Sequence, residues 1–204
     1  MPSAHIAPPG RMNTPARSSG SYAFESLWRS IPRSGAVPAR SDFNPALAAE
    51  TLRNILLVEG PTASRPGVYL RLVGDALNAN VQHNMTGQNW LDFLPAQYHA
   101  AALATARLIW EHPCGIWQLT PLHYERGYSQ LLEVTIFPLR PAPDGTPLML
   151  AHIEFHAWSR WQRIARGSVL SVETAVDFAF INIGAGVPEW TEERSEAIFG
   201  GAGQ

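Results

Sequence analysis

The segment from Gln97 to Ala157 constrains the fold more than any other part of the chain. Apolar side chains recur at helical spacing along its first part, and strand patterns follow over about 115–124, 128–139 and 148–157. A turn at Gly127 separates the first two strands, and a turn rich in proline and glycine separates the second from the third. A helix packed on a meander of antiparallel strands favours a binding module, and we do not expect an enzyme.

Two more strands and a helix are expected before this segment. The apolar run Ile55–Val58 and the alternating segment Val68–Val73 have the length and pattern of paired strands. Apolar residues at helical spacing over residues 24–31 predict a short amphipathic helix, which Ser21 would cap and Pro32 would end. Short helical pieces are expected between the second strand and the long helix.

This order of elements resembles the PAS domain, and more narrowly a family of stand-alone PAS-type bacterial proteins common in alphaproteobacteria. The residues that carry the resemblance are Leu27-Trp28-Arg29, Pro38, Arg40, Asp42, Pro45, the run Leu70–Gly74, Thr86-Gly87, Phe137-Pro138-Leu139 and Asp144-Gly145. The resemblance implies an α+β fold in which a PAS-like five-stranded antiparallel sheet carries helices on one face. It also implies a sensory role in signal transduction and a homodimer formed through a helix before the domain.

We therefore expect three parts in the chain. Residues 1–20 have too little apolar surface to offset the entropy of ordering and are predicted to be a disordered leader. Residues 21–157 form the PAS-like domain with its N-terminal helix. Residues 158–204 are a C-terminal extension of unknown role, in which Val176–Ile183 is a candidate strand and Pro188 suits the first turn of an acidic helix.

Composition limits the partners and the compartment. The chain has 204 residues, a formal net charge of -2 and scattered arginines, so no nucleic-acid footprint is expected. No stretch approaches the roughly 20 apolar residues of a membrane span, so no membrane partner is expected either. The single cysteine, Cys114, excludes an internal disulfide and is compatible with the cytoplasm.

The main functional prediction is a non-catalytic module that binds a small apolar or aromatic molecule, or a partner regulatory protein, and signals through another chain. Seven residues are predicted to point into a cavity: Leu70, Trp90, Phe93, Ala102, Trp117, Leu132 and Val134. The alternative is that these side chains fill a solid core, because protein interiors are normally close-packed.

A second hypothesis is a pure protein-interaction or dimerisation module with a solid core. Phe24, Leu27 and Trp28, together with Trp158 and Trp161, would then form an apolar surface for self-association or docking. The alternative for the helix is that it folds back onto its own sheet.

A third hypothesis, a metal-dependent protein, rests on His152, Glu154 and His156. These residues alternate along the last strand of the domain, so they share one face and could offer a metal two imidazoles and a carboxylate. The opposite face is apolar, so a solvated exterior is the favoured interpretation of the His/Glu face, and no metal site is predicted.

The cofactor is unknown from sequence. His99 lies on the long helix, where some PAS relatives hold haem iron, but it falls beside the apolar stripe. Cys114 does not lie in the Asn-Cys-Arg-Phe sequence of the flavin-binding members, and it is interpreted as a small buried thiol.

Overall fold

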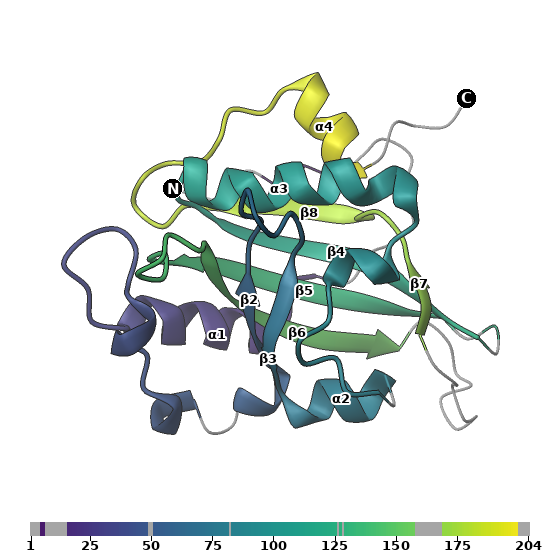
Figure 1. Ribbon diagram of the computed structural model, residues 1–204, viewed down its shortest axis with the longest axis horizontal. Helices are drawn as coiled ribbons and strands as arrows, with labels where there is room; N and C mark the ends of the chain where they lie inside the picture. The colour runs from purple at the N-terminus through teal and green to yellow at the C-terminus, as the bar shows by residue number, and fades with distance from the viewer. Residues whose placement is uncertain are drawn as a thin grey trace.

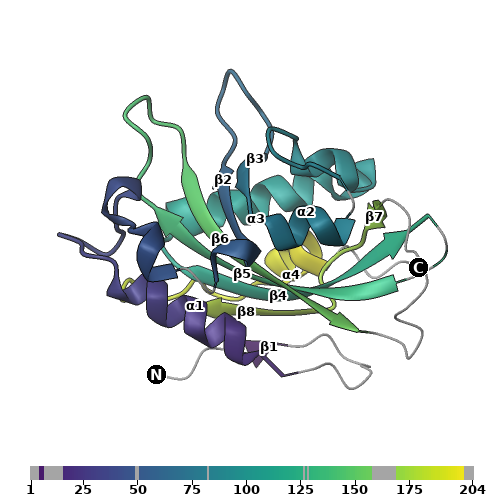
Figure 2. The same ribbon diagram turned by 90° about the horizontal axis from the view of Figure 1, so that it is seen from below.

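The computed structural model describes residues 5–6, 16–48, 51–81, 83–125, 127, 129–157 and 169–199. Its centre is one antiparallel sheet, with helices on both sides (Figures 1 and 2). The strands are β1 (His5–Ile6), β2 (Ile55–Glu59), β3 (Tyr69–Val73), β4 (Gly115–Tyr124), β5 (Ser129–Leu139), β6 (Leu148–Ala157), β7 (Val169–Val172) and β8 (Asp177–Ile181). The α-helices are α1 (Ser19–Ser30), α2 (Asp75–Val81), α3 (His99–Glu111) and α4 (Glu192–Phe199), and short 3₁₀ turns cover Arg40–Asp42, Pro45–Ala48, Leu52–Asn54, Trp90–Phe93 and Ala96–Tyr98.

The strand order is β1-β8-β4-β5-β6-β2-β3, and β7 also pairs with β4. The five predicted strands are neighbours in this order, which confirms the expected α+β fold with its five-stranded antiparallel sheet. β8 lengthens that sheet beyond β4, so the strand predicted over 176–183 is present and belongs to the same sheet. At the turn between β4 and β5, Gly127 has a φ of +74°, a conformation that glycine adopts without steric cost.

Both faces of the sheet are buried. Ile116, Val134 and Met149 belong to an apolar cluster on the side of α3, whereas Leu119, Phe137 and Leu150 belong to one on the side of α1. Figure 2 shows α1 and α3 on opposite sides of the sheet. Successive residues of a strand point to opposite faces, so the central strands carry apolar residues on both faces.

Helix α1 packs on the face away from α3. The Ser18 side chain caps the helix by accepting a hydrogen bond from the Ser21 N–H at 3.1 Å. Phe24 and Trp28 are fully buried, and the Trp28 indole stacks on Phe137 with ring centroids 4.8 Å apart and donates a hydrogen bond to the Pro138 carbonyl oxygen at 3.0 Å. The helix that sequence predicts is therefore present, although its cap is Ser18 rather than Ser21.

The position of α1 corrects the predicted docking surface. Phe24 and Trp28 have no exposed surface, and Leu27 is half-buried against the same apolar cluster. The helix folds back onto its own sheet, which was the alternative left open by the sequence. Trp158 and Trp161, the other residues of that predicted surface, lie outside the described residues.

The described parts of both predicted terminal segments contact the domain. Ser19 already belongs to α1, and residues 5–6 pair with β8, so order begins before the predicted boundary at residue 21. In the C-terminal extension, α4 begins at Glu192 rather than at Pro188 and lies beside α3 (Figure 1). Phe178, Phe180 and Trp190 join it in one aromatic cluster.

Among the residues that the structure describes, no helix is both long enough and apolar enough to cross a lipid bilayer.

We expect Trp28→Ala to lower the free energy of unfolding by roughly 3–5 kcal/mol, because it removes a buried indole together with its hydrogen bond. Urea denaturation followed by fluorescence would measure this change. The matched control is Tyr22→Ala on the exposed side of the same helix, where 55% of the residue surface is open and a loss of about 1 kcal/mol or less is expected. Equal effects of the two substitutions would contradict the packing of α1 on the sheet.

Candidate functional site

A cavity of about 150 Å³ lies between α3 and the sheet. Most of its wall is apolar and comes from strands β2, β3, β5 and β6 and from α3. The apolar side chains that line the cavity are Leu56, Val58, Val68, Leu70, Trp90, Leu94, Ala101, Ala102, Ala106, Ile109, Val134, Ile136, Met149, Ala151, Ile153, Val172, Ala175 and Ile198. A cavity lined in this way favours an apolar ligand over water, because water needs two to four polar partners.

The small residues of α3 create this space. The apolar spacing of this helix predicts one stripe of six residues, and five of them, Tyr98, Ala101, Ala102, Thr105 and Ile109, line the cavity, whereas the sixth, Leu108, packs against the core outside it. Three alanines that line the cavity, Ala101, Ala102 and Ala106, bring the helix backbone close to the sheet but leave no long side chains to fill the interval. The cavity is therefore a consequence of residue size on one helix face.

One side of the cavity is polar. Gln118 and Thr120 point into it from β4, and the Gln118 amide donates a hydrogen bond to the Thr120 hydroxyl at 3.2 Å. Thr105 faces the cavity from α3, and the C-terminal extension adds Glu173 and Thr174. These groups can hydrogen-bond a polar atom of a ligand whose remaining surface is apolar.

The residues predicted to line a cavity are only partly brought together. Leu70, Trp90, Ala102 and Val134 line the cavity under α3. Phe93 and Leu132 line an adjacent space of about 40 Å³, which shares Leu70 and Trp90 with the first.

The prediction that Trp117 points into the cavity is wrong, because this side chain lies on the opposite face of the sheet, buried under α1. Residues directly opposite each other on paired strands share a face, and β4 pairs Gln118 with Val134 and Trp117 with Thr135. The cavity therefore receives Gln118 from β4, which the sequence did not single out.

A buried carboxylate lies on the α1 face, and the sequence did not predict it. Glu133 of β5 is 1% exposed and accepts hydrogen bonds from the Ser18 N–H at 2.9 Å, the Trp117 indole N–H at 2.6 Å and His156 Nε2 at 2.6 Å. Its cross-strand neighbour Glu154 accepts a hydrogen bond from the Ser18 hydroxyl at 2.6 Å. The residue that caps α1 therefore bridges two carboxylates of the sheet.

These contacts and the burial of the side chains shift the pKa values of the groups involved. Burial raises the pKa of Glu133, but the hydrogen bonds from His156, Ser18 and Trp117 outweigh burial and lower it to about 2. The hydrogen bond to Glu133 raises the pKa of His156 above its usual value. Burial lowers the pKa of His152, whose ring stacks on Phe24. When His156 is protonated, which its raised pKa favours, Glu133 and His156 form a partly buried ion pair under the first turn of α1.

The predicted solvated exterior for His152, Glu154 and His156 is wrong. His152 is 3% exposed and the other two are half-buried, because the N-terminal turn of α1 covers this end of the face. Glu133 and Glu154 engage that turn directly, and His156 binds Glu133. Within the described part of the chain, no group of three or more His, Cys, Asp or Glu side chains is arranged to hold a metal ion.

Cys114 and His99 are the two residues that the sequence offers as possible cofactor ligands. Cys114 is buried, as expected, and burial raises the pKa of its thiol to about 12. His99 is half-buried, and its Nε2 lies 3.0 Å from the Leu94 carbonyl oxygen. Neither side chain lines the cavity under α3.

The fold and the cavity define an α+β domain whose antiparallel sheet and long helix enclose a mostly apolar space. The PAS domain family matches residues 16–153, and the chain belongs to this family, whose members are typically sensory modules. No curated protein matches the chain.

Solved structures that resemble the chain include several light-oxygen-voltage (LOV) domains. One is the light state of the blue-light photoreceptor Aureochrome1 LOV, which is 11% identical over 56% of this chain and 88% of its own, with a TM-score of 0.39. Another is the RsLOV d2 variant, which is 13% identical over 72% of this chain and 72% of its own, with a TM-score of 0.39. A fungal LOV domain photoreceptor is 16% identical over 68% of this chain and 94% of its own, with a TM-score of 0.38.

The Glu133–His156 pair predicts a stability maximum between two titrations. Because folding lowers the pKa of Glu133, this group stabilises the folded state fully above its unfolded pKa near 4.5, and the stabilisation is lost as the pH falls toward the folded pKa of about 2. Because folding raises the pKa of His156, this group stabilises the folded state fully below its unfolded pKa near 6.5, and the stabilisation is lost as the pH rises through the folded pKa. Urea denaturation across this pH range would measure both limbs.

Glu133→Gln should flatten both limbs and cost about 2 kcal/mol at neutral pH, because a neutral amide cannot replace the charge-assisted hydrogen bonds. Glu111→Gln, at an exposed position of α3, is the matched control and should leave the profile unchanged. The same pH profile in Glu133→Gln and wild type would disprove this role of the carboxylate.

Proposed function

We propose that this protein is a non-catalytic sensory PAS module that binds a small, mostly apolar molecule in the cavity under α3. The observation that carries the proposal is a largely apolar space with a polar group of side chains, Gln118, Thr120 and Thr105, on one wall. A pocket of this kind selects a ligand by burial and orients it by a few hydrogen bonds. The occupied state would be signalled to a partner regulatory protein.

The volume limits the size of the ligand. A cavity of about 150 Å³ in an apolar protein core is known to take benzene, whereas drug-sized ligands occupy roughly 300–1,000 Å³. The cavity suits one aromatic ring or a short aliphatic chain bearing a hydroxyl, carbonyl or amide. The adjacent space beside Phe93 and Leu132 gives room for a short substituent.

Ala102→Trp should abolish binding by filling the cavity with an indole ring. The measurement is a ¹⁹F NMR titration with the neutral single-ring apolar probe fluorobenzene, together with native mass spectrometry of the purified protein. We expect the variant to bind at least about tenfold more weakly, because a ligand cannot displace a covalently attached ring without unfolding α3. Ala104→Trp, on the exposed side of the same helix, is the matched control and should bind as wild type does.

Two results would count against the cavity as a binding site. One is a probe that binds the Ala102→Trp variant as tightly as the wild type. The other is the combination of no probe binding and no co-purifying molecule, which would favour the solid-core interpretation instead.

Gln118→Leu should reduce the preference for ligands with a hydroxyl group. Gln118 can hydrogen-bond phenol but not toluene, so the ratio of their affinities, measured by displacement of the same probe, should fall about fivefold. An equal loss for phenol and toluene would instead indicate that the substitution distorts the cavity. Ala104→Leu serves as the size-matched surface control.

The predicted homodimer remains a proposal and needs a surface other than Phe24 and Trp28, which are buried within the chain. Light scattering after size exclusion chromatography would give the mass in solution.

A further inference from the structure

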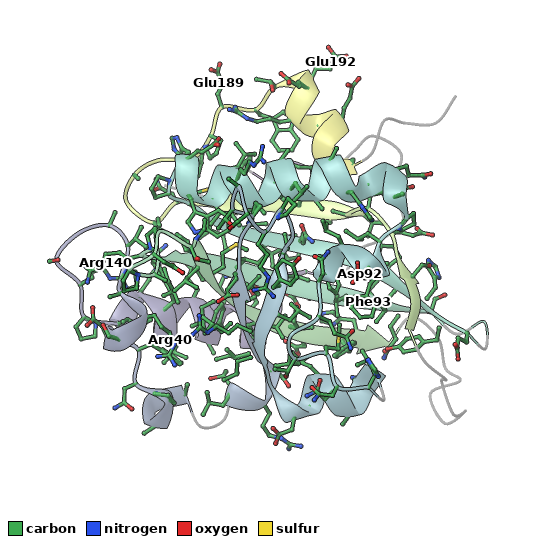
Figure 3. All side chains as sticks on the ribbon, in the orientation of Figure 1. Arg40, Asp92, Phe93, Arg140, Glu189 and Glu192 are labelled. Atoms are coloured by element: carbon green, nitrogen blue, oxygen red, sulfur yellow. The ribbon has the colours of Figure 1, made fainter. Side chains whose placement is uncertain are left out.

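A second hollow, of about 580 Å³, lies on the side of the sheet away from α3. It is bounded by the turn Ala39–Ser41, by Arg71 of β3 and by the segment from Arg140 to Pro143 after β5. Its floor is Leu57 and Leu148, which belong to the apolar cluster under α1. Figure 3 labels Arg40 and Arg140, which lie on the same side of the molecule as α1. The hollow is therefore separate from the cavity under α3.

Three guanidinium groups from distant parts of the sequence line this hollow. Arg71 is held by Glu59 at 2.6 Å, and Arg140 is held by Asp42 at 3.4 Å. Arg40 is exposed and forms no ion pair with any residue that the structure describes. Two of the charges are thus kept in place by acidic partners, whereas Arg40 keeps all of its donors available.

The nearby carboxylates do not cancel this positive charge. Asp42 and Glu59 lie beside the hollow, and Glu59 is shared with Arg65 at 2.9 Å as well as with Arg71. Asp144 is the third acidic group, and its pKa is lowered chiefly by the Thr146 backbone N–H and in smaller part by the charge of Arg71. With Arg65, which does not line the hollow but shares Glu59, four arginines oppose three carboxylates in and beside the hollow, on a chain whose overall charge is negative.

The walls of the hollow are fixed by backbone hydrogen bonds. The Arg140 N–H donates to the Pro38 carbonyl oxygen at 2.8 Å, which joins the turn that carries Arg40 to the end of β5. The turn after Arg140 is closed by the Ala142 N–H, which donates to the Thr146 carbonyl oxygen at 2.8 Å. Pro141 and Pro143 restrict this turn further, because proline fixes φ. A ligand would therefore meet arginines on a preorganised frame.

We propose that this hollow is a binding site for a small organic anion, whose phosphate or carboxylate group contacts Arg40, Arg71 and Arg140 and whose apolar part lies on Leu57 and Leu148. Guanidinium groups match both oxyanions through paired N–H donors. The Ser41 hydroxyl, which donates a hydrogen bond to Asp42 Oδ1 at 3.4 Å, lies at the rim. The arginines are about half-exposed, so the site is of low affinity and sensitive to salt.

Titration with phenyl phosphate at constant ionic strength, followed by amide chemical shifts in NMR, tests this site. We expect saturable shifts at residues 39–42, 71, 140 and 142, and none of these with phenol, which has the ring without the charge. Benzoate in a parallel titration separates the two sources of the anion, since tighter phenyl phosphate binding identifies a phosphate ester and tighter benzoate binding a carboxylate.

Arg40→Ala is the sharpest variant, because it removes a guanidinium that supports no ion pair among the described residues. It should weaken phenyl phosphate binding about tenfold and leave the thermal unfolding temperature unchanged. Arg107→Ala, which removes an exposed arginine from α3, should bind as wild type does.

Ala102→Trp should also retain binding, since it fills only the cavity under α3. The proposal is overturned if phenyl phosphate gives no saturable shifts, if Arg107→Ala weakens binding as much as Arg40→Ala, or if Ala102→Trp abolishes it.

Discussion

The burial of both faces of one antiparallel sheet is the constraint on which the other features of this protein depend. Strands with apolar residues on both sides need a cover on each side, because exposed apolar area costs about 25 cal/mol per Å². On one side α1 supplies Phe24 and Trp28, whose side chains are fully buried against the sheet. On the other side α3 supplies alanines, which cover the sheet but leave a cavity. The cavity between a helix and the sheet thus depends on the size of the residues that the helix presents.

The buried carboxylate of Glu133 shows how the two faces differ in chemistry. Burying a carboxylate inside an apolar layer costs free energy unless its charge is compensated. Here three hydrogen-bond donors compensate it, and one of them, His156, can also carry a positive charge. One of those donors is the backbone of Ser18, so the position of α1 is tied to a single buried charge rather than to apolar contact alone. A helix displaced by one residue would lose the stacking of Trp28 on Phe137 and also the hydrogen bonds of its capped end to Glu133 and Glu154. The polar cluster therefore gives the helix a specific position, and Phe24 and Trp28 supply most of the stabilisation.

Sequence patterns predicted most of the elements of this fold but failed at the assignment of faces. The long helix, the five strands and the extra strand near residue 180 were all predictable, because their apolar spacing and their glycine or proline boundaries are local signals. Trp117 was assigned to the wrong face because β4 alternates apolar Trp117 and Leu119 with polar Gln118 and Thr120, and the polar side of this strand is the one that faces the cavity. His152 and Glu154 were placed in solvent because their alternation is polar, and nothing local shows that the polar end of α1 covers them. Glu133 carried one usable signal, an acidic residue inside the apolar run from Leu131 to Phe137 with no basic neighbour, but its partners come from residues 18, 117 and 156.

The cavity also depends on the segment beyond the family match, which ends at residue 153. Ala175 and Ile198 line the cavity from the C-terminal extension, and β8 joins that extension to β4 through backbone hydrogen bonds. A molecule bound in the cavity, as we propose, would therefore contact α3, the sheet and the extension at once. Helix α4 lies against α3, and its Phe199 packs on Phe178 of β8 and on Trp190. Under the proposed function, a bound molecule would thus contact α4 through Ile198, whereas α1 lies on the opposite face of the sheet and lines no part of the cavity.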